Sequence, residues 1–150
     1  MALSASRNTE RYGEIVAIDS FPVGATKKIY AGGLVAVAKT SATTAYAEAA
    51  SDAASKVCKG VAVADVDNTD GDAGDLNVDV QYGDFEFTSS GLSASYEGSP
   101  VYVNDDESVR LKGDATHDVG VGIITKVLSA TSCRVRITPE SIAYANSFGS

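Results

Sequence analysis

Apolar and polar residues alternate along much of this chain, with the period of a β-strand. From Leu76 to Tyr82 every second residue is apolar, and the residues between them are Asn, Asp and Gln. This spacing turns one side of a strand toward a core and the other toward water. Beyond Gly83 the apolar positions shift by one residue, to Phe85 and Phe87. We therefore predict a β-bulge at this glycine.

The same alternation predicts a strand at residues 133–138. Val101 and Val103 precede the polar loop 104–108, and further apolar residues follow it at Val109 and Leu111, which predicts a β-hairpin. Runs rich in Val, Ile and Ala predict further strands at residues 14–18, 27–31, 34–38, 57–64 and 119–128. We expect an all-β chain of about eight short strands.

Three segments depart from this pattern. Residues 42–56 are rich in Ala and lack Gly and Pro, so their propensity favours a helix. A helix with so little apolar bulk is only marginally stable, which favours an irregular segment with one strand; the sequence leaves both readings open. Residues 89–98 can hold a helical turn, and residues 139–150 are predicted to form a C-terminal tail.

Composition and charge limit the classes of function. A chain of 150 residues forms one domain and is large enough to fold without disulfide staples. The net charge is -8, and residues 61–120 hold 14 acidic and 2 basic residues, so nucleic-acid binding lacks an electrostatic source. Neither a long apolar run nor the apolar core of a signal peptide is present, and we expect synthesis in a cytoplasm.

Few residues suggest chemistry. The acidic segment 65–75 suggests calcium, but its spacing does not fit an EF-hand loop and it is better explained as a solvated turn. His117 is interpreted as an exposed loop residue because no nucleophile motif accompanies it. Cys58 and Cys133 are expected to be buried, reduced thiols, with a single cross-bridge left open. We predict no enzyme, no metal site and no cofactor.

The N-terminal residues form a polar arm that holds too few apolar residues to be fixed by its own core. Such an arm can add as a strand to the sheet edge of a partner protein, and its arginines suit an acidic partner surface. The candidate binding residues are Ala2, Leu3, Ser4, Ala5, Ser6, Arg7, Asn8, Thr9, Glu10 and Arg11.

Five strand-and-turn segments follow one another along the chain: TKKIYAGGLVAV at 26–37, KGVA at 59–62, DNTDGDAGD at 67–75, VDVQYGDF at 78–85 and GSPVYVNDD at 98–106. Their order and spacing, between residues 10 and 138, resemble the capsid decoration, or cement, proteins of tailed bacteriophages, and more distantly the lambda-type head decoration proteins. The resemblance implies a small β-barrel or β-clip-like (tulip) domain with a flexible N-terminal arm and at most one or two short helices. Together with the arm and tail predicted above, the chain divides into an arm at 1–11, a decoration domain at 12–138 and a tail at 139–150.

The resemblance also implies a function. Such a protein would be a structural virion component on the outer capsid surface, would assemble as a homotrimer, and would stabilise the shell by bridging subunits of the major capsid protein. Nucleic acid and membranes are not expected as partners. The sequence leaves two alternatives: a calcium-dependent or carbohydrate-binding β module that uses the acidic loop, and a small peptidase with an essential serine.

Overall fold

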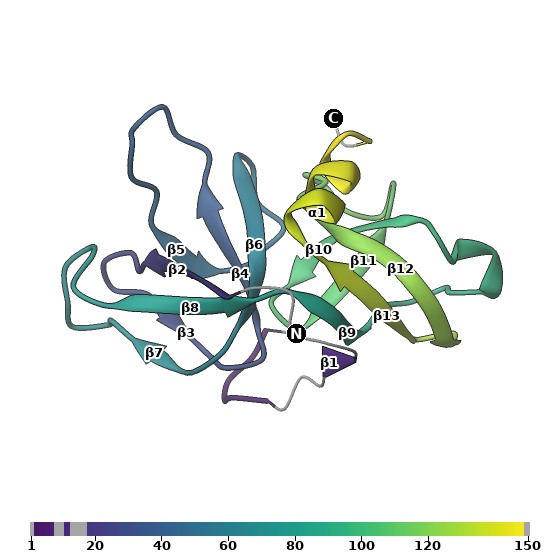
Figure 1. Ribbon diagram of the computed structural model, residues 1–150, viewed down its shortest axis with the longest axis horizontal. Helices are drawn as coiled ribbons and strands as arrows, with labels where there is room; N and C mark the ends of the chain where they lie inside the picture. Colours follow the sequence, from purple (N-terminus) through teal and green to yellow (C-terminus); the bar gives the residue numbers. More distant parts are fainter. Residues whose placement is uncertain (1, 8–10, 13–17, 149–150) are drawn as a thin grey trace.

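The protein is built almost entirely of short strands in two main sheets. The computed structural model describes residues 2–7, 11–12 and 18–148; of Arg11 and Tyr12 it describes the backbone alone. In Figure 1 the strands β2 to β8 occupy the left half of the molecule, and β9 to β13, together with β1 beside β9, occupy the right half. The all-β prediction is therefore confirmed.

The first sheet closes into a small barrel. Its strands follow the order β9, β11, β10, β12, β13, and β13 pairs again with β9, while β1 pairs with β9 as an addition. Its members are β1 (Arg11–Tyr12), β9 (Gly83–Thr88), β10 (Pro100–Asp105), β11 (Ser108–Leu111), β12 (Gly120–Ser129) and β13 (Ser132–Ile137). The predicted hairpin is confirmed, because Val101 pairs with Leu111 and Val103 pairs with Val109.

The second sheet has five strands in the order β2, β8, β6, β4, β5. They are β2 (Ile18–Pro22), β4 (Leu34–Ala38), β5 (Ala47–Ala49), β6 (Lys56–Ala62) and β8 (Asn77–Gln81). A separate ribbon pairs β3 (Lys28–Ile29) with β7 (Val66–Asp67). The described residues thus form thirteen strands rather than about eight, in part because the short strands β1, β5 and β7, of two or three residues each, lie outside the predicted runs.

Strand β4 joins two hydrophobic clusters. Leu34 and Ala36 lie in the cluster that fills the barrel, whereas Val35 and Val37 lie in the cluster of the second sheet. A strand buried on both faces has a continuous apolar run rather than an alternating one. This explains why residues 34–38 contain no polar position, and it shows that the two sheets share one core element.

The predicted bulge at Gly83 is wrong, and the shift in the apolar pattern has another cause. Val78 and Val80 of β8 lie in the cluster of the second sheet, whereas Phe85 and Phe87 of β9 lie in the barrel cluster. The chain leaves one sheet and enters the other at Gly83, whose φ of 151° favours glycine. The shift therefore marks a change of sheet.

Two ambiguous segments are resolved. Residues 42–56 contain no helix; they run as a loop into the short strand β5, as the second reading proposed. Within residues 89–98 a 3-10 turn, η1, spans Ala94–Tyr96. Neither segment carries enough apolar bulk to pack a longer helix.

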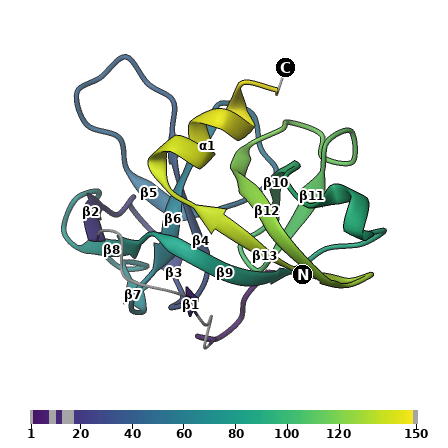
Figure 2. The same cartoon turned by 45° about the vertical axis from the view of Figure 1, so that its right-hand side comes forward.

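The predicted C-terminal tail is wrong for residues 139–146, which form the helix α1 (Pro139–Asn146). Thr138 caps this helix by accepting a hydrogen bond from the Ser141 backbone, and Pro139 occupies its first turn. Ile142 and Ala145 are buried, and the Tyr102 hydroxyl donates to the Ala145 carbonyl at 3.1 Å. The helix lies over the junction of the two sheets (Figures 1 and 2).

Candidate functional site

The N-terminal arm lies where the two sheets meet. The Leu3 backbone N–H donates a 2.8 Å hydrogen bond to Oδ1 of Asp106, in the turn between β10 and β11. The Asp106 carbonyl in turn accepts from the backbone of Leu34, the first residue of β4. One acidic turn therefore holds both the arm and the second sheet.

Gly33 makes room for the arm. A Cβ atom at this position would lie 2.8 Å from Cδ1 of Leu3 and 3.2 Å from the Tyr30 carbonyl oxygen. Any side chain there would displace Leu3, which is partly buried. Gly33 thus has a steric role in seating the arm.

Arg7 provides the second anchor of the arm. Its backbone N–H donates to the Ala31 carbonyl at 2.9 Å, and its Nη1 donates to the Glu107 carbonyl at 3.2 Å. The guanidinium carbon lies 5.7 Å from the centre of the Phe87 ring, within the range of a cation–π contact. Arg7 is partly buried as a result.

Between and beside these anchors the arm is exposed. Ala2, Ser4, Ala5 and Ser6 are exposed, and no described residue forms a hydrogen bond with the backbone of residues 4–6. Asn8, Thr9 and Glu10 lie outside the described residues. Further along, Arg11 pairs with Phe85 at the edge of β9.

These contacts correct one expectation from the sequence. The arm was expected to lack partners on its own domain, but Leu3 and Arg7 both bind to it, and β1 extends its own barrel. The sequence reasoning missed Gly33, Phe87 and Asp106. Three consecutive acidic residues in the hairpin turn, opposite a basic arm, were the available signal.

Burial changes the pKa of Asp106, the carboxyl group that binds the arm. Asp106 is only 2% exposed, and burial raises its pKa above the usual Asp range despite the hydrogen bond from Leu3. The neighbouring charges of Asp105 and Glu107 act in the same direction. The carboxylate that holds the arm is therefore less stable in its charged form than an exposed aspartate.

The acidic loop 65–75 is organised around a buried amide. Asn68 is 2% exposed, and its Nδ2 donates to the carbonyls of Gly24 and Asp72, each at 3.0 Å. Asp67 accepts from Thr69, and Asp75 accepts from the backbone of Asp72. Across residues 2–7, 11–12 and 18–148, no three His, Cys, Asp or Glu side chains are grouped as metal ligands would be.

His117 and the two cysteines occupy structural positions. The His117 ring is 39% exposed on the loop between β11 and β12, and its backbone N–H donates to Asp52 at 2.8 Å. Cys58 and Cys133 are fully buried and unpaired, as expected. Burial raises the pKa of the Cys58 thiol to about 12 and that of the Cys133 thiol to about 11.

Comparison with known proteins gives one structural likeness. No family of known proteins matches the chain, and no curated protein sequence is significantly similar to it. The chain is similar to a crystal structure described as the head fiber gp8.5 N base in bacteriophage phi29, with 18% identity and a TM-score of 0.45. The match covers 81% of this chain and 95% of that chain. At this level the likeness assigns no residue role to the present chain.

No helix of the described chain is both long and apolar enough to span a bilayer.

Proposed function

We propose that this protein is a structural virion protein that binds the outer surface of an assembled phage capsid and bridges major capsid subunits through residues 2–11. The proposal rests on the resemblance of residues 10–138 to capsid decoration proteins and on the geometry of the arm. No step of it requires chemistry by the protein.

The observation that carries the proposal is the arm fixed at two points. Leu3 and Arg7 hold it on the domain, while residues 4–6 between them are exposed. A short exposed segment whose backbone N–H and C=O groups bind no described residue can add to the sheet edge of a partner. Because it is already held at both ends, less conformational entropy is lost when it binds.

We expect the protein to act as a homo-oligomer, with a trimer as the expected form. Once one subunit of a trimer binds, the other two meet their sites at a high effective concentration. Weak contacts from each arm then add to a stable attachment. The acidic residues of segment 61–120 would keep densely arrayed copies soluble.

The experiment compares how the unchanged protein and its variants bind to purified capsids that lack this protein. Deleting residues 2–11 is expected to leave a folded oligomer that no longer sediments with capsids. A finer test replaces Ser6, which is exposed, with Pro or with Ala. Pro removes one backbone donor and Ala keeps it, while both leave the Leu3 and Arg7 anchors in place.

The expected result is a loss of capsid affinity of about two- to thirteenfold for Ser6→Pro, the value of one net hydrogen bond of about 0.5–1.5 kcal/mol. Ser6→Ala should bind like the unchanged protein. Equal capsid binding by the deletion variant and the full chain would refute the role of the arm.

A further inference from the structure

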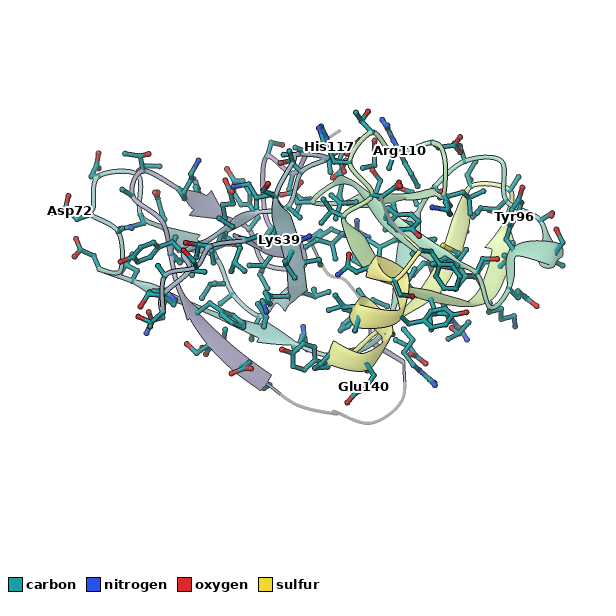
Figure 3. The ribbon with its side chains drawn as sticks, turned by 90° about the horizontal axis from the view of Figure 1, so that it is seen from above. Lys39, Asp72, Tyr96, Arg110, His117 and Glu140 are labelled. Atoms are coloured by element: carbon teal, nitrogen blue, oxygen red, sulfur yellow. The ribbon has the colours of Figure 1, made fainter. Side chains whose placement is uncertain are left out.

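A cleft on the side of the molecule that carries α1 plays no part in seating the arm. Its volume is about 300 Å³, and it lies where the second sheet, the loop between β11 and β12, and the end of α1 meet. Figure 3 shows Lys39 near the middle of the molecule and His117 near the upper edge of that view. The lining residues used below are Lys39, Ser55, Thr116, His117, Asp118 and Asn146.

One wall of the cleft is held in place. Both oxygens of Asp52 accept backbone hydrogen bonds, from Thr116 and from His117, each at 2.8 Å. Arg110 lies 3.6 Å from the same carboxylate and donates to the Asp114 carbonyl at 3.0 Å. The loop is therefore fastened before any ligand arrives, which lowers the entropy that binding would cost.

Backbone strain gathers at this cleft. Among the described residues, the non-glycine residues with positive φ are Thr26, Ser55 and Asp118. Ser55, with φ of 60°, and Asp118, with φ of 49°, both line the cleft. Strained residues cluster at binding sites, where the surrounding structure holds a side chain in a required direction.

Asp118 presents an unsatisfied acceptor. Its side chain is 12% exposed, its Oδ2 lies 3.9 Å from Nζ of Lys112, and no described residue forms a hydrogen bond with its buried Oδ1. A buried carboxylate oxygen without a donor is costly. A ligand in the cleft reaches this carboxylate through the 12% of the side chain that is exposed, where a hydrogen-bond donor would offset part of that cost.

The other polar groups of the cleft include donors. The Asn146 oxygen accepts from the Gly120 backbone at 2.9 Å, which leaves its amide nitrogen as a donor. Lys39 is exposed and forms no ion pair within the described chain. Nδ1 of His117 lies 3.1 Å from the Asp52 carbonyl, so a neutral His117 ring keeps Nε2 as an acceptor.

Charge selects the class of ligand. A free anion would meet the Asp118 carboxylate, and a metal ion would meet the ammonium group of Lys39. Lys56 also lines the cleft but is paired with Glu48. A neutral molecule whose groups both donate and accept hydrogen bonds fits this arrangement, and hydroxyl groups do both. The volume lies at the lower end of the range for ligand sites, roughly 300–1,000 Å³, which suits a small ligand.

We infer that this cleft binds a neutral saccharide unit, whose hydroxyls donate to Asp118 and accept from Lys39 and Asn146. The site lies apart from the acidic loop 65–75, where the sequence had suggested a carbohydrate module. The inference does not depend on the capsid role.

The test is a titration of the full chain, labelled with nitrogen-15, against glucose, galactose, mannose, rhamnose and N-acetylglucosamine, followed by amide chemical shifts. At least one sugar is expected to shift the amides of Thr116, His117 and Asp118 with saturation. Sodium sulfate and calcium chloride serve as the competing ligand classes.

Two variants examine the cleft directly. Asp118→Gly removes the carboxylate and relieves the positive φ, so we expect a fold at least as stable and a loss of sugar affinity of about tenfold or more. Thr26→Gly is the matched control, because it relieves the same kind of strain far along the chain from the cleft residues. Lys39→Ala, at an exposed position, should also weaken binding.

The proposal is overturned if none of the sugars shifts the cleft amides, or if sulfate or calcium shifts them and no sugar does. It is also overturned if Asp118→Gly binds sugar as tightly as Thr26→Gly. Failure of capsid binding by the arm variants would leave these results unchanged, so the two proposals fail separately.

Discussion

The backbone N–H of Leu3 donates a 2.8 Å hydrogen bond to Oδ1 of Asp106, although 103 residues separate the two in sequence. Asp106 also accepts, through its carbonyl, from the first residue of β4. The turn between β10 and β11 therefore connects the arm, the barrel and the second sheet. We expect substitutions in this turn to weaken the attachment of the arm before they lower the stability of the core.

Gly33 and Leu3 should be energetically coupled. Gly33→Ala places a Cβ 2.8 Å from Leu3 Cδ1, so it should destabilise the full chain by about 1–3 kcal/mol, as overpacking does. In a Leu3→Ala background the side chain that clashes is shorter, and the cost should fall. Chemical denaturation of the four proteins measures this coupling. Equal costs of Gly33→Ala in both backgrounds would mean that the arm does not occupy this position.

The pH dependence of stability should carry a contribution from Asp106. Because its pKa is raised in the folded state, its contribution is full below its unfolded pKa and is lost as pH rises through the folded pKa. Asp106→Asn cannot ionise and lacks this contribution. The stability of the variant relative to the unchanged protein should therefore rise between about pH 3 and about pH 7. A constant difference, measured by denaturation across this range, would contradict the buried state of this carboxyl.

Several strands could be predicted from the sequence because the local alternation of apolar and polar residues determines them. The hairpin of Val101, Val103, Val109 and Leu111 was predicted, since apolar residues alternate on both sides of a polar loop, and the structure adds its register. Gly83 shows the limit of such rules. A one-residue shift in pattern has the same appearance whether a strand bulges or moves to a second sheet, and only tertiary packing separates the two.

Only the composition of the arm could be predicted from the sequence, and not its position on the domain. The basic arm could be read from its composition, but its seat depends on contacts between residues about a hundred positions apart. Helix α1 was missed because its short apolar face, Ile142 and Ala145, is too small to give a helical pattern. Its burial becomes visible only against the barrel and Tyr102.

Helix α1 should contribute to stability through Ile142. This side chain is 6% exposed, so Ile142→Ala should lower the free energy of unfolding by about 2–5 kcal/mol through lost burial and a cavity. Tyr144, on the same helix, is 44% exposed and makes an edge-to-face contact with the ring of Phe148. Tyr144→Ala should cost at most about 1 kcal/mol. Similar losses for both variants in denaturant titrations would indicate that the helix does not pack as described.

The two thiols should be unreactive in the folded protein. Burial raises the pKa of Cys58 to about 12 and that of Cys133 to about 11, so neither forms the nucleophilic thiolate at neutral pH. A chromogenic disulfide reagent should label neither cysteine in the native state and both cysteines in concentrated guanidinium chloride. Rapid native labelling of either cysteine would show that its part of the core opens readily.

The central claim is that the arm attaches this protein to a capsid. Cryo-electron microscopy of capsids prepared with and without the protein tests it most directly. We expect added density on the outer surface, with residues 2–7 lying against major capsid subunits on both sides of a subunit boundary. No added density, or density in which this segment points into solvent away from the shell, would contradict the account.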